Sequence, residues 1–168
     1  MAIDYSKNRY FEVTESSIQG KGAFAIKKIR KGQRIIEYTG EIISPEEESI
    51  RYDDENMDRH HTFLFAVDDK RTIDAGEIGS DAKYINHSCD PNCEAVDDSG
   101  RIFIEALRTI KKGEELFYDY GFEQEEPPTQ ELIDQYPCHC GSVNCRGTIL
   151  KYEPPKKKLS KKSKRRKR

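Results

Sequence analysis

The sequence of 168 residues predicts one mainly β domain, and three observations indicate it. The length suits a single domain with a real core, but not two domains. The apolar residues of the first 120 positions fall into short runs rich in β-branched and aromatic side chains, which is typical of strands. Gly, Asp and Lys-Gly turns separate these runs. The predicted strands cover Tyr10–Val13, Ala23–Ile26, Arg34–Tyr38, Glu41–Ile43, Phe63–Val67, Ile102–Ala106 and Glu115–Tyr118.

The predicted strand Phe63–Val67 is apolar at every position. A short continuous apolar run of this kind indicates a strand that is buried on both faces. The body shows no internal repeat and no regular alternation of strands with long helices, so we do not expect a βαβ architecture.

Two short helices are expected between the strands. In the first, Ser44 can cap the N-terminus, Pro45 suits the first helical position, and Glu46–Glu48 suit the positive end of the helix dipole. Glu47 would complete a capping box with Ser44. The second helix is predicted from about Thr129 to Gln135, after a break at two consecutive prolines.

The charges divide the chain into an acidic body and a basic tail. The chain has 29 Lys and Arg against 31 Asp and Glu, a formal net charge of −2. Residues 156–168 (KKKLSKKSKRRKR) hold 10 of the basic residues and no acidic one, so residues 1–155 keep 19 basic and 31 acidic residues, a charge of −12. We expect the tail to be disordered and to contact a nucleic acid or another polyanion. A nuclear-localisation signal or a solubilising end are the alternatives.

Membrane and secreted proteins are not expected. No apolar run approaches the roughly 18 residues that cross a bilayer, and the first ten residues lack the apolar stretch of a signal peptide. With 35% apolar residues, the chain should have a compact core under a charged surface. We therefore expect a soluble, intracellular protein without membrane contact.

The five cysteines favour a metal site over disulfides. Their odd number and the lack of a secretion signal argue against a disulfide framework. Three of them cluster in PCHCGSVNCRG, where glycines permit the tight turns that bring thiols to one ion. Zinc prefers four ligands, so Cys89 or Cys93 would supply the fourth. The alternatives are reduced thiols without a metal or a redox pair, and His139 is a disfavoured ligand.

Three segments carry the residues that suit chemistry. Residues 20–24 (GKGAF) form a glycine turn, which alone indicates a tight hairpin, because the third glycine and the helix of a dinucleotide site are absent. Residues 84–93 (YINHSCDPNC) place Asn86, His87 and Ser88 directly after an apolar residue, where they could form a hydrogen-bonded turn. Residues 113–122 (GEELFYDYGF) place Tyr118 and Tyr120 on one side of a strand, either in the core or lining a site.

Together, these segments and the cysteine cluster resemble the SET-domain family of protein-lysine methyltransferases. The matching segments are GKGAF, YINHSCDPNC, GEELFYDYGF and CHCGSVNCRGTI, and their order and spacing cover about residues 10–150. The resemblance implies several small sheets, short helices, a knot-like C-terminal arrangement and a zinc-binding post-SET element. It divides the chain into a catalytic domain (1–122), an acidic connection (123–136), the post-SET element (137–153) and the basic tail (154–168).

The resemblance also implies a cofactor, a catalytic residue and a metal. S-adenosylmethionine would contact the glycine turn and the Asn-His pair, and a tyrosine at the end of the first helix would line the methyl-transfer region. The implied cofactor residues are Lys21, Gly22, Ala23, Phe24, Tyr52, Asn86 and His87. Tyr120 matches the catalytic tyrosine. The implied ligands of a structural zinc are Cys89, Cys138, Cys140 and Cys145, which leaves Cys93 as the spare thiol.

The chemistry of methyl transfer agrees with these roles. The amine of lysine must be neutral to attack, although its ordinary pKa is about 10.4, and desolvation in an aromatic channel favours the neutral form. Tyr120 would orient the amine and would not act as a general base, because a phenol has an ordinary pKa near 10. A tyrosine at position 118 predicts mono- or dimethylation in preference to trimethylation.

The acidic body suits a basic substrate, with a histone or another chromatin protein as the leading class. The carboxylates that could attract it are Asp53, Asp54, Glu55, Asp58, Glu123, Glu125 and Glu126, although they could equally be solvated surface charges. This function predicts a location in the nucleus or on chromatin, with the cytoplasm as the alternative. The other candidate functions are methylation of a ribosomal or other non-histone protein and a non-catalytic, zinc-stabilised module that binds nucleic acid through the tail.

Overall fold

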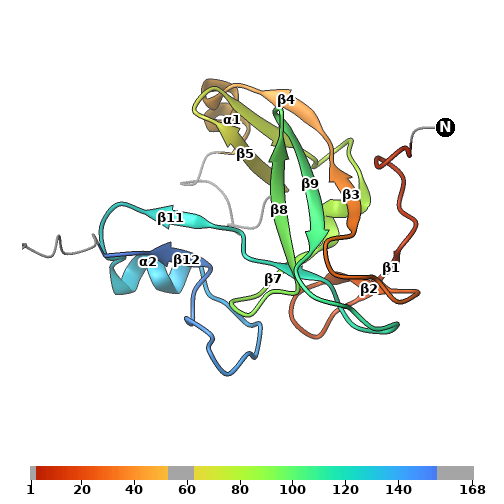
Figure 1. Ribbon diagram of the computed structural model, residues 1–168. Helices are drawn as coiled ribbons and strands as arrows, with labels where there is room; N and C mark the ends of the chain where they lie inside the picture. Colours follow the sequence, from red (N-terminus) through yellow and green to blue (C-terminus); the bar gives the residue numbers. More distant parts are fainter. Residues whose placement is uncertain (1–2, 53–62, 155–168) are drawn as a thin grey trace, which may run out of the picture.

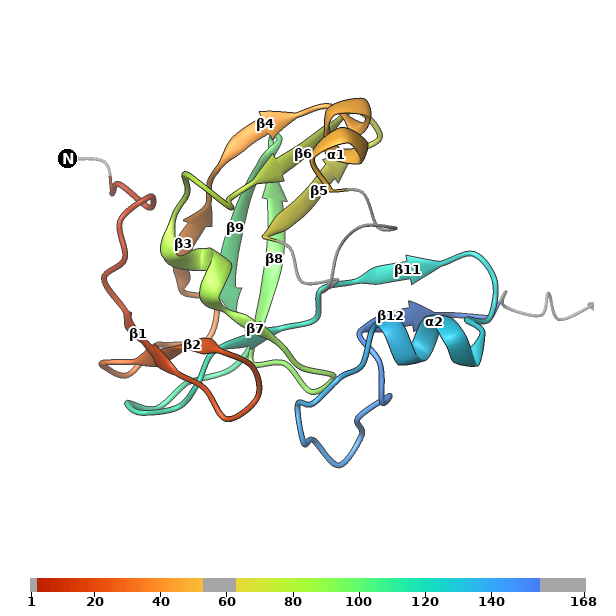
Figure 2. The same cartoon turned by 180° about the vertical axis from the view of Figure 1, so that it is seen from behind.

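The computed structural model describes residues 3–52 and 63–154, and Figures 1 and 2 show it from opposite sides. The described chain consists of short strands in five small sheets, with two short α-helices and one 3₁₀ turn. The predicted mainly β class is therefore confirmed. The basic tail after Pro154 and the acidic residues Asp53, Asp54, Glu55 and Asp58 lie outside the described residues.

The core is built on a three-stranded antiparallel sheet with the order β3-β9-β8. These strands are β3 (Arg34–Tyr38), β9 (Arg101–Ala106) and β8 (Cys93–Asp98). Ile36 pairs with Ile104 across the sheet and both are buried. The pairing of β3 with β9 is irregular between Arg34 and Ile36. At this point two consecutive residues, Ile35 and Ile36, are both buried.

The second three-stranded sheet has the order β4-β6-β5, with β4 (Glu41–Ile43), β6 (Arg71–Asp74) and β5 (Leu64–Asp68). The prediction that β5 is buried on both faces is wrong, because none of its residues is buried. The strand lies at the edge of its sheet, and Leu64 and Phe65 line a cavity. Its apolar side chains therefore form a wall and not an interior layer.

Helix α1 (Pro45–Arg51) follows β4 and begins as predicted. The backbone N–H of Glu47 donates to Ser44 Oγ at 3.3 Å, and Pro45 occupies the first turn. The second half of the predicted capping box is wrong, because the Glu47 carboxylate accepts a hydrogen bond from Arg51. None of the residues of α1 is buried, so polar contacts must attach this helix to the body.

The glycine turn forms the hairpin that its sequence indicates. Strands β1 (Phe11–Glu15) and β2 (Lys21–Ala25) pair antiparallel, and Gly20 adopts a φ of 49° in the turn. A 3₁₀ turn, η1 (Asp81–Tyr84), leads into β7 (Asn86–His87). Strand β7 pairs in parallel with β10 (Phe117–Tyr118), which brings two of the candidate segments together.

The C-terminal part forms a small unit beside the body. Strand β11 (Phe122–Gln124) pairs in parallel with β12 (Leu150–Tyr152), and α2 (Gln130–Gln135) lies between them in the sequence. Helix α2 begins near the predicted position, with Thr129 Oγ1 accepting the N–H of Leu132 at 3.3 Å. In both views, α2 lies next to β12. Within the described residues, no helix has the length and apolar character that crossing a bilayer requires.

Candidate functional site

The centre of the candidate site is the parallel pair of β7 and β10. It places His87 opposite Tyr118, and the N–H of Ser88 donates to the Tyr118 carbonyl at 3.2 Å. Asn92 is buried and binds the chain just before β10. Its Oδ1 accepts the N–H of Phe117 at 2.8 Å, and its Nδ2 donates to the carbonyl of Glu115 at 2.8 Å. The polar side chains of this segment therefore hold the backbone that carries the two tyrosines.

Asn86 joins β7 to the glycine turn. Its Nδ2 donates to the Lys21 carbonyl at 3.0 Å and to Glu115 Oε1 at 3.1 Å. A β-carbon at Gly22 would lie 2.1 Å from the same Glu115 oxygen. Because Asn86 holds that carboxylate in place, the absence of a side chain at Gly22 is required for the three segments to meet.

His87 is buried and connects Tyr120 to the cysteine cluster. The backbone N–H of Tyr120 donates to His87 Nδ1 at 3.1 Å, which assigns the ring proton to Nε2. Nε2 lies 3.5 Å from Cys89 Sγ. Burial lowers the pKa of His87 to about 4, against an opposite contribution from Asp119. The ring is therefore neutral near pH 7, which its acceptor role at Nδ1 requires.

Tyr120 and Tyr118 form an aromatic pair with ring centroids 4.9 Å apart. The Tyr120 hydroxyl donates to the Ile85 carbonyl at 3.3 Å. The Tyr118 hydroxyl, which is buried, forms no hydrogen bond with any residue that the structure describes. Burial raises the pKa of both phenols above their ordinary value of 10. Both hydroxyls therefore stay protonated near neutral pH and can orient a ligand, but neither can act as a base there.

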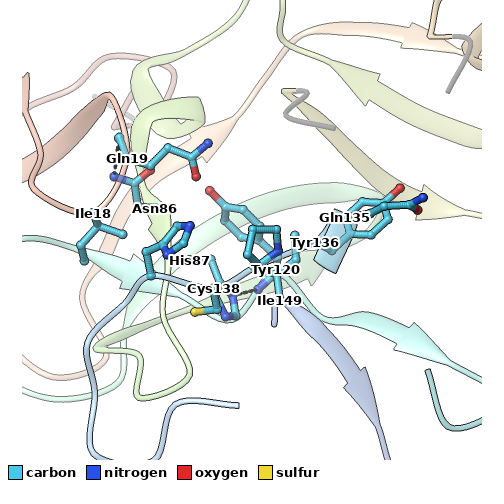
Figure 3. A pocket seen from close by; sticks show the side chains of 11 residues that line it. Ile18, Gln19, Asn86, His87, Tyr120, Gln135, Tyr136, Cys138 and Ile149 are labelled. Carbon is cyan, nitrogen blue, oxygen red and sulfur yellow. Dashed lines mark hydrogen bonds between the residues drawn. The ribbon is translucent and has the colours of Figure 1, made fainter. Parts of the chain in front are cut away.

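Two cavities meet at Tyr120. The smaller, of about 200 Å³, lies against the turn of the first hairpin, β7 and the chain after α2. Figure 3 shows Asn86, His87 and Tyr120 lining it. The larger, of about 640 Å³, lies between α1, β5 and β11, and is lined by aromatic side chains, namely Tyr38, Tyr52, Phe63, Phe65, Tyr118, Tyr120, Phe122 and Tyr136. Tyr120, Tyr136 and Ile149 line both cavities.

Asp74 attaches α1 to the body at the wall of the larger cavity. Its Oδ1 accepts from the Tyr52 hydroxyl at 3.0 Å, and its Oδ2 accepts from Arg51 Nη1 at 3.0 Å. Arg51 also pairs with Glu41 at 2.8 Å. One further bond joins the helix to β6, from Thr72 Oγ1 to Glu48 Oε2 at 2.7 Å. These polar contacts, and no buried side chain, place α1 beside the cavity.

Four cysteines form a candidate metal centre. The Sγ atoms of Cys89, Cys138, Cys140 and Cys145 all lie within 4.8 Å of one another, and those of Cys89 and Cys138 are 3.7 Å apart. Four thiolates at about 2.3 Å from one tetrahedral zinc lie about 3.8 Å apart. Backbone N–H groups of Arg146 and Gly147 donate to two of the sulfurs at 3.4 Å. The donor set and its spacing therefore fit Zn²⁺.

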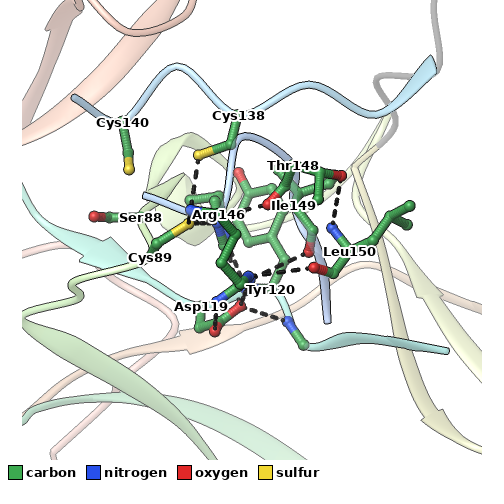
Figure 4. Close-up of polar contacts among 12 residues, drawn as sticks. Ser88, Cys89, Asp119, Tyr120, Cys138, Cys140, Arg146, Thr148, Ile149 and Leu150 are labelled. Atoms are coloured by element: carbon green, nitrogen blue, oxygen red, sulfur yellow. Dashed lines mark hydrogen bonds and ion pairs between the residues drawn. The ribbon is translucent and has the colours of Figure 1, made fainter. Parts of the chain in front are cut away.

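Arg146 connects this cluster to the segment of the two tyrosines (Figure 4). Its N–H donates to Cys89 Sγ, and its guanidinium donates to both carboxylate oxygens of Asp119, at 2.8 and 3.1 Å. Burial raises the pKa of Asp119, but the hydrogen bonds from Arg146 and from the Gly121 N–H outweigh it and hold the pKa below its ordinary value. Asp119 is therefore ionised, and the ion pair fixes the backbone directly before Tyr120.

The structure brings most of the predicted site residues together. The four cysteines form one cluster, and Asn86, His87, Tyr118 and Tyr120 meet where the two cavities join. Lys21, Gly22, Ala23 and Phe24 line neither cavity, and of the four only Lys21, through its carbonyl, is hydrogen-bonded to Asn86, which lines the smaller one. Tyr52 lines the larger cavity, and Cys93 is buried away from the cluster in β8.

The sequence interpretation missed several residues that line the smaller cavity. They are Ile18, Gln19, Gln135, Tyr136, Pro137 and Ile149. Ile18 and Gln19 immediately precede the glycine turn, so their position in the hairpin was the available signal. The residues from α2 onward carry no comparable motif, because they reach the cavity only through the folding of the C-terminal unit.

Comparisons with known proteins agree with this geometry. The SET domain family matches residues 20–121. The histone-lysine N-methyltransferase trr of Drosophila melanogaster is 41% identical over 150 residues, which cover 87% of this chain and 6% of that protein. The histone-lysine N-methyltransferase 2D of Homo sapiens is 41% identical over 155 residues, covering 87% of this chain and 3% of that protein. The H3 lysine-4 specific histone-lysine N-methyltransferase of Neurospora crassa is 42% identical over 141 residues, which cover 80% of this chain and 10% of that protein. The chain thus spans a small part of each relative's length.

Proposed function

Because the chain belongs to the SET domain family, we propose that it is a protein-lysine N-methyltransferase that uses S-adenosylmethionine. The observation that carries the proposal is the position of Tyr120, which lines both the smaller cavity and the larger, aromatic one. A methyl donor in the first and a lysine side chain in the second would meet beside its hydroxyl. Two reactants held in this way gain the rate advantage of orientation.

The smaller cavity is proposed to hold the cofactor, which supplies an activated methyl group on a sulfonium. Asn86 and His87 lie on its wall beside the first hairpin. At about 200 Å³ it is smaller than the roughly 300–1,000 Å³ of ligand pockets in general, so a nucleoside-sized molecule would also use its open rim. The segment from Gln135 to His139 lines this cavity.

The larger cavity is proposed to hold the substrate lysine. Tyr38, Phe65 and Tyr118 would surround the aliphatic part of the side chain and exclude water. Desolvation disfavours the charged amine, and this lowers its pKa toward the neutral, nucleophilic form. The Tyr120 hydroxyl, already directed at the Ile85 carbonyl, would hold the amine lone pair toward the methyl group.

The Cys89–Cys138–Cys140–Cys145 cluster is proposed to hold a structural zinc. Its ligands come from the segment after β7 and from the segment after α2. The metal would therefore close one wall of the smaller cavity, which Cys138 lines. Binding free energy of such a metal contributes directly to folding.

A basic protein is the proposed substrate, with a histone as the leading candidate. Glu48 and Glu123 line the larger cavity, and Glu125 and Glu126 are exposed nearby in the sequence. Carboxylates at a cavity that receives a lysine favour peptides with further basic residues. The relatives are named as histone-lysine methyltransferases, and this substrate would place the protein at chromatin in the nucleus.

Mono- or dimethylation is proposed on the basis of Tyr118. Tyr118 lines the larger cavity, and its buried hydroxyl forms no hydrogen bond with the described residues. It can therefore hold a water molecule where a more highly methylated amine would otherwise turn. We expect Tyr118→Phe to shift product masses toward trimethyl-lysine. Mass spectrometry of a methylated peptide checks this, and an unchanged product distribution would contradict it.

Methyl transfer from labelled cofactor to histones and to a whole-cell extract tests the proposed function. Labelled histones support the leading substrate. Labelling confined to other proteins in the extract would support a non-histone target. No labelling of either by protein that contains zinc and binds the cofactor would overturn catalysis and leave the non-catalytic binding module.

A further inference from the structure

Two basic loops that are about 80 positions apart in the sequence lie side by side in the fold. One is residues 27–31 (KKIRK), after β2, and the other is residues 108–112 (RTIKK), before β10. The backbone groups of Ile29 and Ile110 exchange two hydrogen bonds of 2.9 Å. Figures 1 and 2 both place these loops beyond β2, at the end of the molecule away from β11 and α2.

The loops concentrate positive charge on an acidic body. Residues 1–155 contain 19 basic residues, and seven of them lie in these two five-residue segments, which contain no Asp or Glu. All seven side chains are exposed. We call them the basic ridge, and its members are Lys27, Lys28, Arg30, Lys31, Arg108, Lys111 and Lys112.

Most cations of the basic ridge have no carboxylate partner among the residues that the structure describes. Arg108 pairs with Glu114 at 2.8 Å, and the Lys27 ammonium lies 4.4 Å from the centre of the Tyr10 ring. Across residues 3–52 and 63–154, the other five form no ion pair with a carboxylate. Like charges on neighbouring loops repel one another, and this repulsion is relieved when an anionic partner binds.

The form of the ridge distinguishes between kinds of anionic partner. Ile29 and Ile110, the two large apolar residues inside the segments, are 1% and 0% exposed, so they offer no anchor to a protein. Protein interfaces depend on buried apolar or aromatic anchors, whereas a phosphate backbone is bound mainly by lysine and arginine charges with release of counterions. All seven residues of the ridge are of the second kind, and Ile26, directly before the first segment, is a single exposed apolar side chain beside them (42% exposed).

We propose that the basic ridge binds the phosphate backbone of double-stranded nucleic acid. This goes beyond the proposed function, because none of the seven residues lines either cavity. A duplex on the ridge leaves the aromatic cavity open to a peptide. Contacts of this kind position a protein on a duplex without reading its sequence.

Fluorescence anisotropy with a labelled duplex of mixed sequence tests the proposal on the full chain, basic tail included, without cofactor or peptide. The ridge variant is Lys28→Gln/Lys31→Gln/Lys112→Gln. The control variant Lys70→Gln/Arg71→Gln/Lys151→Gln removes the same charge from positions outside the ridge. The slope of the logarithm of the association constant against log salt is negative, and each lost phosphate contact reduces its magnitude by about 0.9. We expect the magnitude of this slope to fall by about 2 to 3 in the ridge variant and to stay unchanged in the control.

Equal affinities and slopes for the two variants would overturn the proposal. So would a loss of binding to polyglutamate, a model acidic protein, without any loss of binding to the duplex. Methylation of a short peptide is measured in parallel, and we expect it to be the same in both variants and the unsubstituted chain. This separates the proposal from the proposed function: a chain that fails to methylate can still bind the duplex through the ridge.

Discussion

Different interactions hold two walls of the larger, aromatic cavity in place. One wall contains Tyr118 and Tyr120, lies on the buried pairing of β10 with β7, and is connected to the cysteine cluster through His87 and Arg146. The opposite wall, α1, has no buried residue and is attached by side chains that meet at Asp74 and Thr72. The first wall fixes the groups proposed for chemistry, and the second would present polar groups to the proposed peptide substrate. Substitutions that disrupt the first wall should lower turnover, and substitutions that disrupt the second should weaken substrate binding.

The largest effect is expected from removing a zinc ligand. Cys89→Ser should lose the metal and all methyl transfer, because Cys89 joins the C-terminal unit to β7 and β10. Cys93→Ala is the matched control, since this thiol is buried in β8 outside the cluster. Metal analysis and unfolding temperature measure the outcome. One bound zinc in the Cys89 variant, at the stability of the unsubstituted chain, would contradict the proposed metal centre.

The link through Arg146 should have the next largest effect. Arg146→Gln removes the two hydrogen bonds to Asp119 while leaving the backbone bond to Cys89 possible. We expect kcat to fall by about 10- to 100-fold, as for other residues that position metal ligands, with bound zinc retained. Arg146→Lys should recover part of this loss.

A second bidentate ion pair provides the control for Arg146. Arg101 donates to both oxygens of Glu37 at 2.9 and 2.6 Å, on the surface of the central sheet. Exposed pairs of this kind contribute about 0–1 kcal/mol to stability. Arg101→Gln should therefore leave kcat unchanged. If both variants lose turnover equally, Arg146 has only a general structural role.

The α1 wall should respond mainly in substrate binding. Asp74→Asn removes the carboxylate that accepts from Arg51 and Tyr52 and is itself only 6% exposed. We expect KM for a basic peptide to rise about threefold or more while kcat stays within about twofold. This pattern is expected when the lost interaction stabilised the bound substrate and the transition state equally. Steady-state kinetics check this, with Glu41→Gln, an exposed partner of Arg51, as the milder variant. A selective fall in kcat would place α1 in the catalytic geometry.

The smallest expected effect is on stability: the contribution of Asp74 to the free energy of unfolding should depend on pH. Burial raises the pKa of Asp74, but the Gly76 N–H, Tyr52 and Arg51 outweigh it and hold the pKa below its ordinary value of 3.8. Glu41 also faces Arg51, and its pKa is lowered too, mainly by Arg51. A lowered folded pKa gives stability that is present above the unfolded pKa and is lost as the pH falls through the folded one. The difference in unfolding free energy between the unsubstituted chain and Asp74→Asn should therefore shrink below about pH 4. A difference that is constant from pH 6 to pH 3 would contradict this.

The same contrast explains what could be predicted from the sequence. Strand β3, strand β4 and the start of α1 were predicted because hydrophobic pattern and capping are local signals. Strands β6 and β7 were missed because Asp74, Asn86 and His87 are polar yet buried, through bonds to distant residues. The choice of Cys89 over Cys93 as the fourth thiol came from the family resemblance, since spacing alone does not separate them. The roles of Arg146 and Asp74 had no local signal.

The proposed meeting of cofactor and lysine at Tyr120 is tested most directly by Tyr120→Phe, which removes the hydroxyl and keeps the ring. Tyr5→Phe is the control, because Tyr5 packs on Phe103 away from both cavities. The measurement is kcat for methylation of a lysine peptide, together with the Kd of S-adenosylmethionine. We predict a loss of about 10²- to 10³-fold in kcat for Tyr120→Phe, the size seen when one preorganised hydroxyl or amide is removed, with Kd unchanged. Unchanged turnover in a folded, cofactor-binding Tyr120→Phe protein would contradict the account.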